Sequence, residues 1–197
     1  GCSLFFDEAF AFMQLSQIAC DPSDNLWRTA LVDFYSCLES QPPDPEYGYK
    51  EGTQLFIAQI EGALSPAYAA FEVAYYTVVA YYVDTPDKAI WREKLIDLLE
   101  SNNADSGQQI FTLGAATWAL AQTGDLDETP IFVGSGSWGG FPGGAAVKLQ
   151  QLPPLLASYQ LSAAAPTYGN HFYSIYNPPN PGFSGWTETN IYAAMGL

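Results

Sequence analysis

Apolar residues recur three and four positions apart along most of this chain, which predicts a mainly helical fold. This spacing is found in residues 3 to 19, 25 to 39, 67 to 83, 88 to 101 and 108 to 122. Proline, glycine, asparagine and aspartate stand between these stretches, and such residues end helices. We therefore expect helices that are joined in pairs by short turns.

Two of the expected helices share one sequence pattern. WRTALVD, which begins at Trp27, returns as WREKLID at Trp91, 64 positions later (91 minus 27). Each copy follows an apolar helix and a short acidic turn that contains proline. A repeat of helix, turn and helix is typical of stacked α/α hairpins, which bury their apolar faces on one another. We predict one α/α-repeat domain over residues 1–197, with both tryptophan helices in its outer layer.

The remaining stretches are less regular. Residues 67 to 83 are apolar on all sides, which predicts the innermost helix. Residues 46 to 62 should be irregular or form a hairpin, with 54 to 60 a strand or a helical turn. Six glycines in residues 131 to 144 predict short β or extended insertions. Residues 145 to 159 are expected to form a helix that is broken at Pro153 and Pro154. Residues 187 to 197 resemble the start of another inner helix, so we expect a truncated or capped C-terminal end.

The net charge of the chain restricts the classes of partner that it can bind. Twenty-one acidic residues against six basic ones give a net charge of −15, which repels nucleic acids and anionic membranes. No apolar run reaches the ~18 residues of a membrane span, since the longest one contains Glu72. We therefore expect no nucleic-acid partner and no transmembrane segment. The acidic, aromatic-rich and lysine-poor composition is common among secreted proteins.

The hairpin geometry selects one cysteine pair. Cys20 falls at the turn of the first hairpin and Cys37 at its open end, about 20 Å apart at ~1.5 Å per residue. Cys2 lies near the same open end as Cys37. A Cys2–Cys37 disulfide is predicted, provided that the helix ends meet and the compartment is oxidising. Cys20 would then be a small buried residue. Lipidation is the alternative for Cys2, because Gly1-Cys2-Ser3 resembles the end of a lipoprotein signal.

Acidic residues at helix starts are the candidate catalytic groups. Asp7 and Glu8 fall in the first turn of the first helix, and Glu188 falls at the start of the last. Carboxylates that converge at one mouth of the helices can act as general acid and base in glycoside cleavage. The alternative is that they cap their helices. His171, the only histidine, is a candidate base or a structural imidazole.

Two further groups of residues are candidate ligand contacts. Trp138, Trp186 and Tyr173 lie in glycine-rich or aromatic segments and are the candidate ligand-binding residues, the tryptophans as sugar platforms. Asp125, Asp127 and Glu128 place hard oxygen ligands in one turn, which suits Ca²⁺. Helix capping is the alternative for these acids, and no other cofactor is expected.

The tryptophan hairpins, the small-residue segment TLGAATWALAQTG and the closing GFSGWTETNIYAAMGL resemble the α/α toroid proteins related to terpenoid cyclases and protein prenyltransferases. The resemblance implies inner and outer helices that alternate around a barrel. The chain is too short for six hairpins and lacks the acidic DxDD cluster, so cyclase activity does not carry over. The broader likeness, to uncharacterised secreted prokaryotic proteins, implies an extracellular or cell-surface location.

These observations predict a secreted or cell-surface binding or structural module, with a polysaccharide or a surface protein as its partner. An extracellular glycan-active enzyme that uses paired carboxylates is one alternative. A self-assembling surface or filament subunit, which is a homo-oligomer, is the other.

Overall fold

The computed structural model describes residues 2–19, 25–101, 110–124, 131–132, 137–138, 141–142, 144–158 and 194–196. These residues are mainly helical, which confirms the predicted fold class. The helices are α1 (Phe6–Ile18), α2 (Leu26–Glu39), η2 (Pro45–Tyr47), α3 (Gly52–Ala63), α4 (Pro66–Val83), α5 (Lys88–Ser101), α7 (Ile110–Thr123), η3 (Leu149–Gln151) and α8 (Leu152–Ser158). None of the described helices has the length and hydrophobicity that a membrane span needs.

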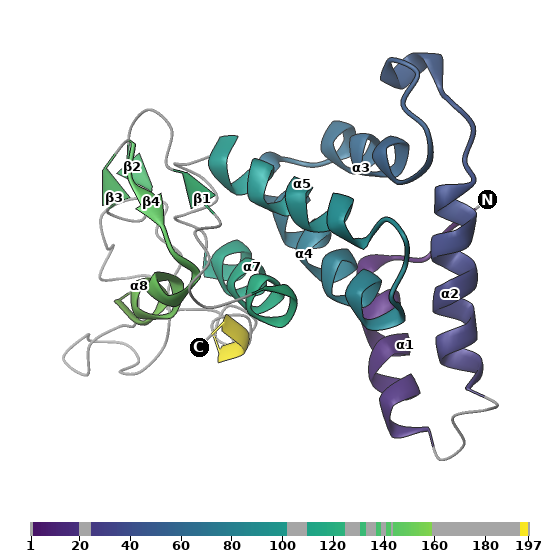
Figure 1. Cartoon of the computed structure of the whole chain (residues 1–197), viewed down its shortest axis with the longest axis horizontal. Helices are drawn as coiled ribbons and strands as arrows, with labels where there is room; N and C mark the ends of the chain where they lie inside the picture. Colours follow the sequence, from purple (N-terminus) through teal and green to yellow (C-terminus); the bar gives the residue numbers. More distant parts are fainter. Residues whose placement is uncertain are drawn as a thin grey trace, which may run out of the picture.

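Helix α4 lies at the centre of the helical layers. It packs against α1 on one side and α7 on the other, while α2, α3 and α5 cover this inner layer (Figure 1). Its alanine and valine side chains are buried around the whole circumference of the helix, as are Tyr75 and Tyr76. The prediction that this segment forms the innermost helix is therefore confirmed. A helix that is apolar on all sides is stable in water only when neighbours cover it.

The sequence repeat corresponds to two structural hairpins, α1–α2 and α4–α5. Leu31 of α2 and Leu95 of α5 occupy equivalent positions, and both are fully buried. The equivalence fails at the tryptophans, because Trp91 is 0% exposed and Trp27 is 40% exposed. Trp91 is enclosed by aromatic side chains from α2, α3 and α4, whereas the ring contact of Trp27 is with Phe12 of α1.

The predicted disulfide is present. Cys2 and Cys37 are bonded, with their Cα atoms 5.6 Å apart. The bond ties the segment before α1 to the last turn of α2, so the open end of the first hairpin is closed covalently, as the hairpin geometry required. Cys20 lies outside the described residues.

The segment before α4 contains an α-helix, α3, so the helical alternative for residues 54 to 60 is confirmed. The strand, and an irregular segment from residue 52 onward, were wrong. Leu55, Ile57, Ala58 and Ile60 are all buried, because α3 packs against α2, α4 and α5 together. Burial on several sides hides the helical period in the sequence. Gly52 starts the helix with φ at +54°, and a Cβ there would lie 3.0 Å from the carbonyl oxygen of Glu39. Glycine permits both features.

Short antiparallel pairs follow the inner helices. Strand β1 (Ile131–Phe132) pairs with β4 (Ala146–Val147), and β2 (Ser137–Trp138) pairs with β3 (Phe141–Pro142). The expected extended segment is thus confirmed where it is described. The helix expected from residue 145 begins only at Leu152, after β4 and η3. Pro153 and Pro154 stand in its first turn, where a missing N–H breaks no helical bond, so the predicted break was wrong.

A helical turn at residues 194–196 packs against α7 and α8. A Cβ on Gly196 would lie 2.8 Å from the carbonyl oxygen of Gly114 and from a methyl carbon of Leu156. The rest of the predicted C-terminal helix lies outside the described residues.

Candidate functional site

The three inner helices run in the same direction. Ring contacts between α1 and α4 advance together along both helices, from Phe6–Phe71 to Phe10–Tyr75, and Ser16 is bonded to Tyr82. The contacts between α4 and α7 advance in the same way, from Tyr68–Phe111 to Tyr75–Trp118. The carboxyl-terminal halves of α1, α4 and α7 therefore lie side by side, and so do their amino-terminal halves.

A groove crosses the carboxyl-terminal halves of these helices, and we call it the C-terminal groove. Its volume is about 380 Å³, within the range of about 300–1,000 Å³ that is usual for small-molecule sites. Its described lining combines amide, aromatic and small apolar side chains from α1, α4 and α7: Met13, Gln14, Gln17, Val78, Tyr81, Tyr82, Trp118 and Gln122. These lining residues carry no charge.

Hydrogen bonds and ring contacts fix the aromatic residues of the groove. The hydroxyls of Ser16 and Tyr82 are joined by a hydrogen bond of 2.7 Å, and the buried Asn25 donates its amide to the Ser16 carbonyl at 2.6 Å. Trp118 packs against Phe10 and Tyr75, with ring centroids 5.5 and 5.6 Å apart. Because these partners belong to the core, the rings are held in place before any ligand arrives.

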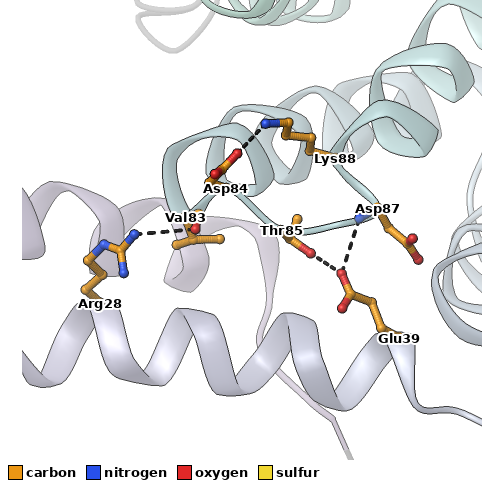
Figure 2. Close-up of polar contacts among 7 residues, drawn as sticks. All are labelled: Arg28, Glu39, Val83, Asp84, Thr85, Asp87 and Lys88. Carbon is orange, nitrogen blue, oxygen red and sulfur yellow. Dashed lines mark hydrogen bonds and ion pairs between the residues drawn. The ribbon is translucent and has the colours of Figure 1, made fainter.

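The turn that follows Tyr81 and Tyr82 is anchored from α2 (Figure 2). The Glu39 carboxylate accepts hydrogen bonds from the Thr85 hydroxyl and from the Asp87 N–H, the latter at 3.4 Å. Arg28 donates to the Val83 carbonyl at 3.4 Å from the other end of α2. The outer helix thus holds the end of α4 that carries the tyrosines of the groove.

Asp84 and Lys88 form an ion pair within this turn (Figure 2). Hydrogen bonding from Lys88 lowers the pKa of the Asp84 carboxyl, and its positive charge adds to this effect. The Lys88 ammonium also lies 5.6 Å from the centre of the Tyr81 ring. The Lys88 ammonium beside the groove is therefore already engaged by a carboxylate and an aromatic face.

Acidic side chains gather at the opposite, amino-terminal end of the inner helices. Asp7 and Glu8 are exposed and act locally as caps: Glu8 accepts from the Phe5 N–H and Asp7 accepts from the Glu8 N–H, both at 3.0 Å. This capping is the alternative that the sequence left open for them. Neither side chain is among the described residues of the C-terminal groove.

Glu72, on α4, is an acidic residue that the sequence reasoning did not single out. Burial raises the pKa of its carboxyl, and the negative charge of Asp7 raises it further. Burial also raises the pKa of Tyr76, one turn later, with contributions from the charges of Glu72, Asp7 and Glu8. Tyr76 donates its hydroxyl hydrogen to the Leu4 carbonyl at 2.8 Å. The signal that could have found this position is its single carboxylate in an otherwise apolar helix.

The other predicted site residues are not placed by the structure. His171, Tyr173, Trp186 and Glu188 lie outside the described residues, as do Asp125, Asp127 and Glu128 of the predicted Ca²⁺ turn. Trp138 lies in β2, where only the backbone is described. Within the described ranges, no three His, Cys, Asp or Glu side chains are grouped so as to hold a metal ion. The Ca²⁺ site remains a prediction.

A smaller hollow, of about 210 Å³, lies between α3 and α5. Its lining is largely charged, and Lys94 and Glu61 form an ion pair across the two helices at 2.7 Å. Because Lys94 and Glu61 already pair with each other, we interpret this hollow as a contact between two helices and not as a ligand site. The C-terminal groove, with its neutral and preordered lining, is therefore the candidate functional site.

The residues of the C-terminal groove were missed because their sequence signal is weak. Gln14 and Gln17 place two amides on one exposed face of a helix expected to be inner, and Trp118 interrupts a run of small residues. Only the parallel register of the helices brings these positions together.

No protein family, curated protein or solved structure matches the chain, so the resemblance to α/α toroid proteins stays a prediction.

Proposed function

We propose that this protein is a secreted or cell-surface binding module that holds a neutral ligand in the C-terminal groove. The observation that carries the proposal is the lining of that groove, in which glutamine amides and fixed aromatic rings from three helices face one space. Such a site binds through stacking and paired hydrogen bonds. The Cys2–Cys37 disulfide supports the location, since disulfides persist in oxidising compartments.

The lining of the groove favours binding over hydrolysis. Acid–base cleavage needs a proton donor and a proton acceptor beside the bound ligand. The described lining residues with hydrogen-bonding groups are glutamine, tyrosine and tryptophan, and this lining includes no carboxylate and no histidine. The glycan-active enzyme stays an alternative that depends on Glu188 and His171.

The self-assembling subunit is the other alternative. The observation that bears on it is the exposure of Ile18 and Leu26 at the turn of the first hairpin. Sedimentation of the protein over a range of concentrations tests this alternative directly.

A ligand-observed NMR screen tests the proposed function. The probes are a panel of neutral compounds: monosaccharides, disaccharides, primary amides and uncharged tripeptides. Gln122→Glu places a charge in the groove with little change of shape. Gln54→Glu, at an exposed glutamine of α3 outside the groove, is the matched control.

At least one class of probe should bind the wild type and the Gln54→Glu variant, and bind Gln122→Glu at least tenfold more weakly. The reason is that a carboxylate has no N–H to donate to the ligand and would lose hydration when the ligand covers it. The proposal fails if no probe binds, or if every bound probe binds all three proteins equally.

A further inference from the structure

We infer that the C-terminal groove takes a neutral oligosaccharide, with one sugar ring stacked on Trp118 and its hydroxyls bonded to Gln14, Gln17 and Gln122. This inference rests on the proposed function and names the class of ligand. It follows from the groups that line the groove, from the charge around it and from the way its rings are held.

The aromatic part of the lining fits the faces of a sugar ring. A pyranose presents C–H groups on its faces, and the negative face of an aromatic ring attracts such polarised hydrogens. Trp118 is half-buried, packed on Phe10 and Tyr75, and it also lines the groove. An indole held in this way loses little side-chain entropy when a ligand binds.

The amide part of the lining fits the edges of the same ring. Each glutamine amide carries two N–H donors and a carbonyl acceptor, and each sugar hydroxyl both donates and accepts. Neighbouring hydroxyls can therefore pair with one amide through both of its groups. Gln14 and Gln17 come from α1 and Gln122 from α7, so amides approach the groove from two of its three helices.

Other classes of ligand fit this site less well. An anionic ligand would meet a net charge of −15, and the neighbouring Lys88 is already paired with Asp84. A lipid would need a large apolar surface, but the floor residues Met13 and Val78 are 3% and 6% exposed. A bound peptide usually relies on an open sheet edge or on deep apolar pockets for anchor side chains. The described lining provides neither.

Titration by calorimetry tests the ligand class. The probes are the neutral disaccharides cellobiose, maltose, xylobiose and chitobiose, with digalacturonic acid as the anionic comparison and triglycine as the neutral peptide. Trp118→Leu removes the flat ring, Trp118→Phe keeps one, and Trp27→Leu changes a tryptophan outside the groove as the matched control. Gln14→Ala/Gln17→Ala removes two exposed amides and leaves the core intact.

At least one neutral disaccharide should bind the wild type and the Trp27→Leu variant. Its affinity should fall at least tenfold in Trp118→Leu and in Gln14→Ala/Gln17→Ala, and less in Trp118→Phe. Circular dichroism reports whether Trp118→Leu is folded, and if it is not, the double glutamine variant decides alone.

The inference is overturned if no neutral disaccharide binds, or if the groove variants bind it as the wild type does. When triglycine, or a primary amide from the NMR panel, binds instead, and Gln122→Glu abolishes that binding, the proposed function stands and the sugar assignment falls. When no probe binds at all, both fall.

Discussion

The two hairpins α1–α2 and α4–α5 carry the same Trp-Arg pattern in their second helices, but they are stabilised by different means. The second hairpin lies between other helices, so Trp91 is surrounded by Tyr35, Phe56 and Tyr76. The first hairpin lies at the edge of the inner layer, and Trp27 remains partly exposed. A disulfide closes the open end of this edge hairpin.

The difference shows that the position of a repeat in the layer decides how much its residues contribute to the stability of the fold. A large aromatic residue stabilises strongly only where neighbours enclose it. At the edge of the layer a covalent bond restricts the unfolded chain instead. The two hairpins should therefore respond to different perturbations.

The largest expected effect is the loss of Trp91. Trp91→Ala should lower the free energy of unfolding by about 3–5 kcal/mol, because it leaves a cavity at a fully enclosed site. Trp27→Ala should lower it by only about 0.5–1.5 kcal/mol. Urea denaturation of both variants measures the two values, and equal losses would contradict the comparison.

Reduction of the disulfide should come next. The free energy of unfolding should fall by about 2–4 kcal/mol when the Cys2–Cys37 loop is opened by reductant or by Cys2→Ser/Cys37→Ser. Hydrogen exchange should quicken in α1 and α2 more than in α4 and α5. Cys20→Ser is the control, and uniform acceleration across both hairpins would show that the bond does not act locally.

A moderate effect is expected where α2 holds the turn between α4 and α5. Glu39→Ala should lower stability by about 1–3 kcal/mol, because it removes the acceptor of the Thr85 hydroxyl and the Asp87 N–H. Glu39→Gln keeps an acceptor oxygen and should lose less. Thermal unfolding compares the two, and identical behaviour of both variants would mean that this contact contributes little.

The smallest effect should come from Glu72 and have the opposite sign. The folded state raises the pKa of this carboxyl above its ordinary value of 4.5, so the charged form destabilises the fold at neutral pH. This penalty disappears as the pH falls through the raised pKa toward the ordinary value. Glu72→Gln should therefore be slightly more stable than the wild type at pH 7.

The gain from Glu72→Gln should shrink as the solution is acidified through that window. Denaturation at several pH values measures it, with the exposed Glu51→Gln as the control. A gain that does not change with pH would show that the charge of Glu72 is not its cause.

The sequence predicted the local role of two acidic residues that lie outside the groove. The acidic residues Asp7 and Glu8 were recognised at the start of a helix, where the structure shows them as caps. The groove was not, because Gln17 and Gln122 are ordinary exposed residues of two separate helices. Segment α3 was misjudged for a different reason, since its buried residues Leu55, Ile57 and Ile60 are spaced by two as well as by three positions, which blurs the helical period.

The sequence by itself determined the mainly helical fold, the two hairpins and the cysteine pair. Each of these depends on local spacing or on the length of a helix, which side-chain order records directly. Only the tertiary structure decided that α1, α4 and α7 run parallel, that Trp91 is enclosed while Trp27 is not, and that amides and aromatic rings meet in one groove. The physical reason is that a helical pattern specifies which face is apolar, but not which helix will cover it.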